Sequence, residues 1–156
     1  MELMQLETFL VEAIQHTYAS ENNRSTVKPA FPGSRQLEYE AGPFFYRDVY
    51  WGASSFAGQE LVTYHAHPVW SMVYAGGMID PMIDENMTKP IIMCLKQALR
   101  AVEPNIPYRG PRSLVNGTFS YHNAPEGTIA QFHGKETILN GGVIVYELLY
   151  QGGLVH

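Results

Sequence analysis

The chain has 156 residues, of which 46% are hydrophobic and 16% are charged, and it carries a net charge of -5. This composition predicts one globular domain over residues 1–156 with a packed core, and it excludes a disordered chain. The acidic balance lacks the clustered lysine and arginine that bind a phosphate backbone, so we expect no direct nucleic-acid partner.

The first predicted element is an amphipathic helix. Apolar residues recur at three- and four-residue steps from Met4 to Tyr18, which is typical of a helix with one buried stripe. The next segment, residues 20–36, has two prolines and a glycine among polar residues and shows no periodicity. It is predicted to be a loop.

A meander of β-strands follows. Residues 44–77 contain alternating, aromatic-rich runs separated by turn signals. Strands are predicted from about Leu37 to Trp51, Gln59 to Tyr64 and Pro68 to Tyr74, with an interruption of the first at Gly42-Pro43 left open as an alternative. The links between them are short, so neighbouring strands must be antiparallel.

A second amphipathic helix is predicted to begin near Thr88 and Pro90 and to end before Pro104. Cys94 lies beside its apolar stripe, which indicates a buried thiol rather than a reactive one. Four further strands are predicted at residues 113–123, 127–132, 135–139 and 142–150.

The order of elements predicts the fold class. Helix, three strands, helix and four strands lack the alternation of a doubly wound sheet. We therefore expect an α+β fold, with a curved antiparallel sheet of about six to seven strands and two helices packed on it. No internal repeat at a fixed period is apparent.

The single cysteine cannot form an internal disulfide, and the sequence shows neither a secretory signal nor an apolar run of membrane-spanning length. We therefore expect a cytoplasmic protein with no membrane partner.

Two histidines are the first candidate for chemistry. His65 and His67 would point to the same face of a strand and could share a metal, as in cupin-type sites. The residues after them lack the glutamate that such a site needs. The better interpretation is a hairpin tip with two solvated histidines, so we predict no metal and no cofactor.

Glu60 is the second candidate, because it shares a predicted strand face with apolar residues. A carboxylate there would have a raised pKa and could act as a general acid or base, as could Asp48. The alternative, which we favour, is a buried structural ion pair of Glu60 with Arg47 or Arg109.

Arg109 lies between two prolines in residues 107–111, which fixes the direction of its side chain. It could anchor a carboxylate or phosphate, or it could cap loop carbonyls. Aromatic residues on the predicted strands could line a pocket that stacks a ring, although ordinary strand packing is the alternative. The candidate ligand-binding residues are Tyr46, Trp70, Tyr74, Arg109 and Tyr146.

Five pieces of the sequence together resemble a known family: PGSRQLEYE, YRDVYWGASSFAGQE, PVWSMVYAGG, PYRGP and VYELLYQGG. The family is a bacterial one of uncharacterised domains, some found alone and others C-terminal to a helix-turn-helix regulator domain. The resemblance covers nearly the whole chain and implies no reaction. Within the matching pieces, the polar and amphipathic residues to test first are Tyr46, Asp48, Glu60, Trp70, Arg109 and Tyr146. The chain has no helix-turn-helix portion, so the resemblance implies no DNA-linked role.

Three functional hypotheses follow from these patterns. The leading one is a small-molecule-binding or sensory module, whose aromatic cleft is closed by the loop at residues 20–36. The second is an enzyme that acts on a small acidic or phosphorylated substrate, with Glu60 or Asp48 as base and Arg109 as anion clamp. The third is a homodimerising interaction domain that uses an exposed aromatic face.

Overall fold

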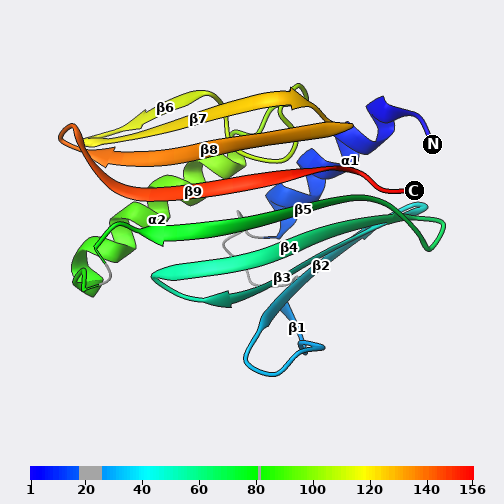
Figure 1. Cartoon of the computed structure of the whole chain (residues 1–156), viewed down its shortest axis with the longest axis horizontal. Helices are drawn as coiled ribbons and strands as arrows, with labels where there is room; N and C mark the ends of the chain where they lie inside the picture. The colour runs from blue at the N-terminus through cyan, green and yellow to red at the C-terminus, as the bar shows by residue number, and fades with distance from the viewer. Residues whose placement is uncertain (18–25, 81) are drawn as a thin grey trace.

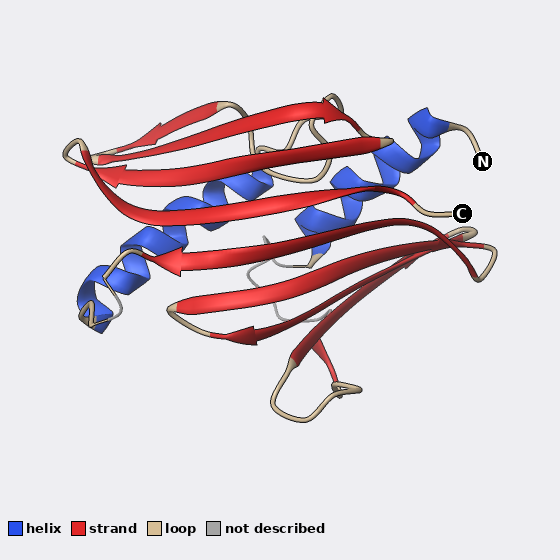
Figure 2. Ribbon diagram, in the orientation of Figure 1, coloured by secondary structure: helices blue, strands red, loops and turns tan. Residues whose placement is uncertain are grey.

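The computed structural model describes residues 1–17, 26–80 and 82–156, which form one open antiparallel sheet with two helices on the same face (Figure 1, Figure 2). The helices are α1 (Leu3–His16) and α2 (Glu85–Arg100). The strands are β1 (Thr26–Val27), β2 (Arg35–Ala41), β3 (Phe44–Gly52), β4 (Ser55–Tyr64), β5 (His67–Met78), β6 (Ser113–Asn116), β7 (Phe119–Thr128), β8 (Gln131–Asn140) and β9 (Val143–Leu154).

The expected α+β class is confirmed, but the described residues form nine strands rather than six to seven. The predicted strand from Leu37 to Trp51 is a hairpin, because Gly42 adopts a φ of 58° and turns the chain between β2 and β3. Gly117, with a φ of 62°, separates β6 from β7 in the same way. The undercount lies in the first half, where the sequence predicts no strand at β1 and one strand in place of β2 and β3. In the second half four strands are predicted and four form, but the predicted strand at 127–132 is wrong because it spans the turn between β7 and β8.

Helix α2 begins earlier than the sequence predicts. The side chain of Asp84 accepts a hydrogen bond from the backbone N–H of Asn86, so it caps a helix that starts at Glu85. Pro90 then lies inside the helix rather than at its start. Both helices bury their apolar stripes against the sheet, and Cys94 lies fully buried on the stripe of α2, as predicted.

The strand order is β1-β2-β3-β4-β5-β9-β8-β7-β6, so the last strand pairs with β5 in the middle of the sheet (Figure 1). This order divides the domain into two equivalent halves. The first half, residues 3–78, contains α1 and β2 to β5, and the second half, residues 85–154, contains α2 and β6 to β9. Apart from the two-residue β1, which also lies in the first half, each half is one helix followed by four antiparallel strands.

The amino-acid sequence carries the same repeat. The segment FAGQE at residues 56–60 corresponds to FHGKE at 132–136, and VWSMVYAGG at 69–77 corresponds to VYELLYQGG at 145–153. The register shifts in the pairs β4–β5 and β8–β9 also correspond, one at Val62/Thr63 and the other at Ile138/Leu139. The expectation that the chain contains no internal repeat is therefore wrong.

An approximate twofold axis relates the halves at the centre of the sheet. There, Tyr74 of β5 pairs with Tyr150 of β9, and these two residues occupy equivalent positions in their halves. Helix α1 packs on β2 and β3, whereas α2 packs on β7 and β8. The two helices also contact each other, and they cover the face of the sheet on which the core lies.

The segment predicted as the loop 20–36 is only partly described, since residues 18–25 lie outside the described ranges. Its later part forms the short strand β1 and a connection that projects from the edge of the sheet (Figure 1). Within the described residues, neither helix has the length and apolar character needed to cross a membrane.

Candidate functional site

Several polar and charged side chains are buried between the sheet and the helices, where proteins rarely place them without partners. The charged ones are Asp48, Glu60, Arg109 and Glu136, and each is no more than 6% exposed. They lie on the inner face of the sheet, except for Arg109, which comes from the segment between α2 and β6.

Asp48 and Glu60 form a side-by-side carboxyl pair in the first half. They are directly opposite each other in the register of β3 and β4, so both side chains point to the helix-covered face. Their exposed fractions are 2% and 4%. The sequence prediction that Glu60 points inward is thus correct.

The partners of these two carboxyls differ. The hydroxyl of Tyr74 donates a hydrogen bond of 2.7 Å to Asp48 Oδ1. Glu60 interacts with the phenol of Tyr46, but its Oε2 atom has no hydrogen-bond partner among the described residues. The indole Nε1 of Trp70 is the other buried side-chain polar atom without a partner there.

Burial disfavours the charged form of both carboxyls. Desolvation raises the pKa of Asp48 to about 7, although the hydrogen bond from Tyr74 and the charge of Arg109 oppose the shift. Desolvation, together with the charge of Asp48, raises the pKa of Glu60 to about 8. The two groups therefore behave as one pair that holds a proton near neutral pH.

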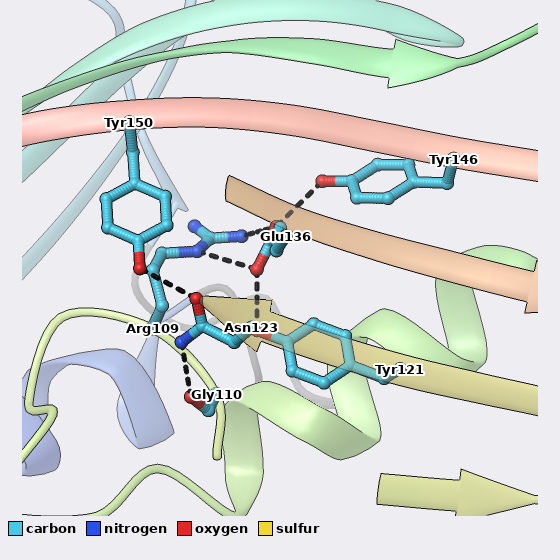
Figure 3. A network of polar contacts seen from close by, with 7 residues as sticks. All are labelled: Arg109, Gly110, Tyr121, Asn123, Glu136, Tyr146 and Tyr150. Atoms are coloured by element: carbon cyan, nitrogen blue, oxygen red, sulfur yellow. Dashed lines mark hydrogen bonds and ion pairs between the residues drawn. The ribbon is translucent and has the colours of Figure 1, made fainter. Parts of the chain in front are cut away.

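The second half contains a different arrangement around Glu136 (Figure 3). The guanidinium of Arg109 donates to both carboxylate oxygens of Glu136, through Nε at 3.0 Å and through Nη2. The hydroxyls of Tyr121 and Tyr146 donate to the same carboxylate at 2.7 Å and 2.9 Å. Glu136 is thus a fully buried carboxylate with four donors and a counterion.

The network in Figure 3 extends to the segment that carries Arg109. The side-chain amide of Asn123 donates to the carbonyl of Gly110 at 2.8 Å and accepts from the hydroxyl of Tyr150 at 2.7 Å. Tyr108 stacks on Phe132 with a centroid distance of 3.8 Å. These contacts fix the backbone on both sides of Arg109.

A narrow cavity lies beside the first carboxyl pair. Its volume is about 20 Å³, and its walls come from β3, β4, β5, both helices and the segment before β6. The lining residues are Ile14, Tyr46, Asp48, Phe56, Glu60, Tyr74, Leu95, Leu99 and Arg109. A cavity of this size with polar walls can hold about one water molecule.

The structure brings together five of the residues singled out from the sequence. Tyr46, Asp48, Glu60, Tyr74 and Arg109 all line the cavity. The favoured ion pair of Glu60 is wrong, however, because Arg109 pairs with Glu136 and Arg47 pairs with the more exposed Glu38. Local sequence gave no means of ranking these carboxylates as partners.

Trp70 and Tyr146 occupy equivalent positions in the two halves and are fully buried, but neither lines the cavity. Trp70 stacks on Phe132 at a centroid distance of 5.8 Å, and Tyr146 donates to Glu136. They are part of the core that supports the site.

His65 and His67 lie at the exposed turn between β4 and β5, where Nδ1 of His67 is 2.8 Å from the carbonyl oxygen of His65. Throughout residues 1–17, 26–80 and 82–156, no three side chains of histidine, cysteine, aspartate or glutamate are grouped as a metal site.

The candidate site residues predicted from the sequence omit four members of the network in the second half, namely Tyr121, Asn123, Glu136 and Tyr150, although Tyr121 and Tyr150 are among the aromatic residues of the predicted strands. The signal that could have found them is the internal repeat, because each is equivalent to a residue of the first half. Tyr121 corresponds to Tyr46, and its neighbours in the network follow in register.

No curated protein and no solved structure matches the chain at a significant level. A model of one protein family matches residues 48–155, which include the carboxyl pair, Arg109 and the whole second half. The match covers more than half of the sequence, so the chain belongs to the family described as Domain of unknown function (DUF5680).

Proposed function

We propose that the protein is a small-molecule-binding module and that its site is the cavity beside Asp48 and Glu60. The observation that carries the proposal is the Oε2 atom of Glu60, a residue that lines the cavity; this atom is buried and has no hydrogen-bond partner among the described residues. A buried carboxyl oxygen without a donor costs free energy that a bound donor would recover.

The lining supports this function because it combines apolar and polar groups on a rigid frame. Ile14, Leu95 and Leu99 supply an apolar roof from the helices, while the phenols of Tyr46 and Tyr74 supply polar groups from the sheet. Ligand sites are typically apolar and contain a small number of polar groups that point toward the ligand. The central strands hold these groups in fixed positions.

Thermal denaturation in the presence of individual metabolites tests the proposal. A ligand of the native state raises the melting temperature, because binding adds RT ln(1 + [L]/Kd) to the free energy of unfolding. We expect at least one compound to stabilise the wild type and to lose its effect with Glu60→Gln. The matched control is Glu126→Gln, which removes an exposed carboxylate from β7.

If no compound stabilises the protein, or if every shift survives Glu60→Gln unchanged, the cavity is not the binding site.

A second candidate function is general acid–base catalysis. The coupled pair of Asp48 and Glu60 favours it, since raised pKa values near neutrality suit one group to donate a proton and the other to accept one. The predicted role of Arg109 as an anion clamp does not fit, because two nitrogens of its guanidinium already donate to the carboxylate of Glu136.

An enzyme converts its ligand into a product, whereas a binding module leaves the ligand unchanged, and this difference distinguishes the two functions. A compound that stabilises the protein is incubated with the wild type and with Asp48→Asn, and the mixture is analysed by mass spectrometry. Conversion that requires Asp48 supports an enzyme. Unchanged ligand in both samples supports a binding module.

A further inference from the structure

We infer that the cavity binds a guanidinium headgroup, which Glu60 holds in the way that Glu136 holds Arg109. This inference rests on the proposed binding function and names the class of ligand. It comes from comparing the two equivalent halves of the domain, one of which contains its own guanidinium.

The sheet residues that line the cavity have equivalents in the second half. The strand registers give five equivalent pairs: Tyr46 and Tyr121, Asp48 and Asn123, Phe56 and Phe132, Glu60 and Glu136, and Tyr74 and Tyr150. The hydrogen bonds correspond as well. Tyr74 donates to Asp48 at 2.7 Å, and Tyr150 donates to Asn123 at 2.7 Å.

In the second half, the segment from Tyr108 to Gly110 contacts this set. Arg109 binds the carboxylate of Glu136, Tyr108 stacks on Phe132, and Gly110 accepts a hydrogen bond from Asn123. The chain therefore fills its own site there: Figure 3 shows the guanidinium of Arg109 at the carboxylate of Glu136, and the ring of Tyr108 covers Phe132.

Among the described residues, the first half contributes no such segment of its own to its carboxyl pair, and Arg109 reaches the wall of the cavity from the second half. Leu37 pairs with Asp48 in the register of β2 and β3. At the equivalent position of the second half, the backbone N–H of Asn123 donates to the carbonyl oxygen of Arg112. Three residues before Leu37 and before Arg112 lie Ser34 and Arg109, so these two residues are equivalent. The side chain of Ser34 is uncharged, and its hydroxyl donates to the carbonyl of Phe31.

The aromatic ring that precedes this position is also placed differently. Phe31 is 56% exposed and contacts Trp51, whereas Tyr108 is 3% exposed and covers Phe132. The connection before β2 projects from the edge of the sheet (Figure 1). The cavity thus lies where the second half has its own arginine segment.

The charges of the interior favour a cationic ligand. Among the buried described side chains, three are carboxyls, namely Asp48, Glu60 and Glu136, and Arg109 is the cation. Arg109 reaches the cavity wall, but its hydrogen bonds go to Glu136, and no ion pair among the described residues joins a cation to Asp48 or Glu60. A bound cation would compensate the pair, whereas a bound anion would add to its repulsion.

The geometry of the carboxyl favours a guanidinium over an ammonium. A planar guanidinium presents two parallel N–H donors to a carboxylate, as Arg109 does at Glu136. Since the cavity has room for about one water, such a group requires a lining side chain to move. Phe56 is the lining residue that is not buried, which makes it the side chain best placed to move.

Three probes that differ in headgroup test the inference: n-butylguanidinium, n-butylammonium and n-butyrate. Isothermal titration calorimetry with the full chain at pH 8 measures each dissociation constant. We expect n-butylguanidinium to bind most tightly, Glu60→Gln to weaken it at least about tenfold, and Glu126→Gln to leave it unchanged. Phe56→Ala, which opens the cavity, should strengthen binding.

Equal or tighter binding of n-butylammonium or n-butyrate would overturn the guanidinium assignment. So would guanidinium binding that survives Glu60→Gln, provided that circular dichroism shows the variant to be folded. If instead a neutral or anionic metabolite stabilises the protein through Glu60, the headgroup assignment fails while the binding function stands. If neither the probes nor any metabolite bind, both fail.

Discussion

Glu60 and Glu136 occupy equivalent positions in β4 and β8, yet among the described residues an arginine pairs with Glu136 and none pairs with Glu60. The same glutamate is therefore a structural anchor in one half and a carboxyl facing a cavity in the other. This difference between repeats, rather than any single motif, locates the candidate site.

Substitution by glutamine should change the stability of the protein differently at the two glutamates. Glu136→Gln leaves the guanidinium of Arg109 buried without a counterion, so the free energy of unfolding should fall by about 3–5 kcal/mol. Glu60→Gln removes a carboxyl that lacks a cation, so stability should be nearly unchanged at pH 6 and increased at pH 9. Urea denaturation at both pH values measures these effects.

The exposed Glu126→Gln serves as the control for both and should change stability by less than about 0.5 kcal/mol. Similar losses from Glu60→Gln and Glu136→Gln at both pH values would show that the two carboxyls play the same structural role.

The carboxyl pair should make stability depend on pH between about pH 4 and about pH 8. Burial raises the pKa of Asp48 and of Glu60 above their unfolded values, so the folded chain binds more protons than the unfolded chain in this range. Their contribution is complete below the unfolded pKa values and is lost as pH rises through the folded ones. The slope approaches about 1.4 kcal/mol per pH unit for each group.

Urea denaturation of the wild type and of Asp48→Asn across this pH range measures the contribution. The asparagine variant resembles the second half, where Asn123 accepts the equivalent tyrosine hydroxyl, so it should fold normally. Its stability should fall less steeply with pH than that of the wild type. Parallel curves for the two proteins would mean that Asp48 has an ordinary pKa.

The twofold relation predicts that substitution of equivalent glycines in the central strands lowers stability by similar amounts. A Cβ atom at Gly76 would lie 2.2 Å from the carbonyl oxygen of Glu147, and one at Gly152 would lie 2.4 Å from that of Ser71. Because these contacts involve backbone of the paired strand, Gly76→Ala and Gly152→Ala should each cost about 1–3 kcal/mol. The control is Val73→Ala, a change at an exposed position of β5, which should cost under about 1 kcal/mol.

Chemical denaturation of the three variants checks this prediction. If either glycine variant is as stable as Val73→Ala, the close approach of β5 and β9 is not maintained in solution.

Cys94 should react with thiol reagents only when the protein opens. Its side chain is fully buried in α2, and burial raises the pKa of the thiol, so little thiolate is accessible in the folded state. Labelling by a disulfide reagent at pH 8 should be slow in buffer and should accelerate in parallel with unfolding in urea. Complete labelling within seconds in buffer would contradict the packing of α2 on the sheet.

Local patterns predicted much of the fold. Apolar periodicity located both helices, because a buried stripe must recur with the pitch of the helix. Alternation and short links predicted the antiparallel sheet. The strand count was too low because Gly42 turns the chain within an apparently continuous pattern and because the two-residue β1 is too short to show alternation.

Prediction of the site was less complete. Alternation along the strands placed Glu60 and Asp48 on the inner face, because successive side chains of a strand point to opposite faces. The partner of Arg109 could not be chosen from sequence, since Glu136 is contributed by a distant strand and several carboxylates were available.

By itself, the sequence determined which residues enter the core and which helices and strands they form, since both depend on periodicities of a few residues. It also contained the repeat that relates Tyr74 to Tyr150. Only the tertiary structure decided that the two halves differ at their equivalent glutamates. Whether a buried carboxyl meets an arginine or a cavity depends on where a distant loop packs, and local patterns do not encode that packing.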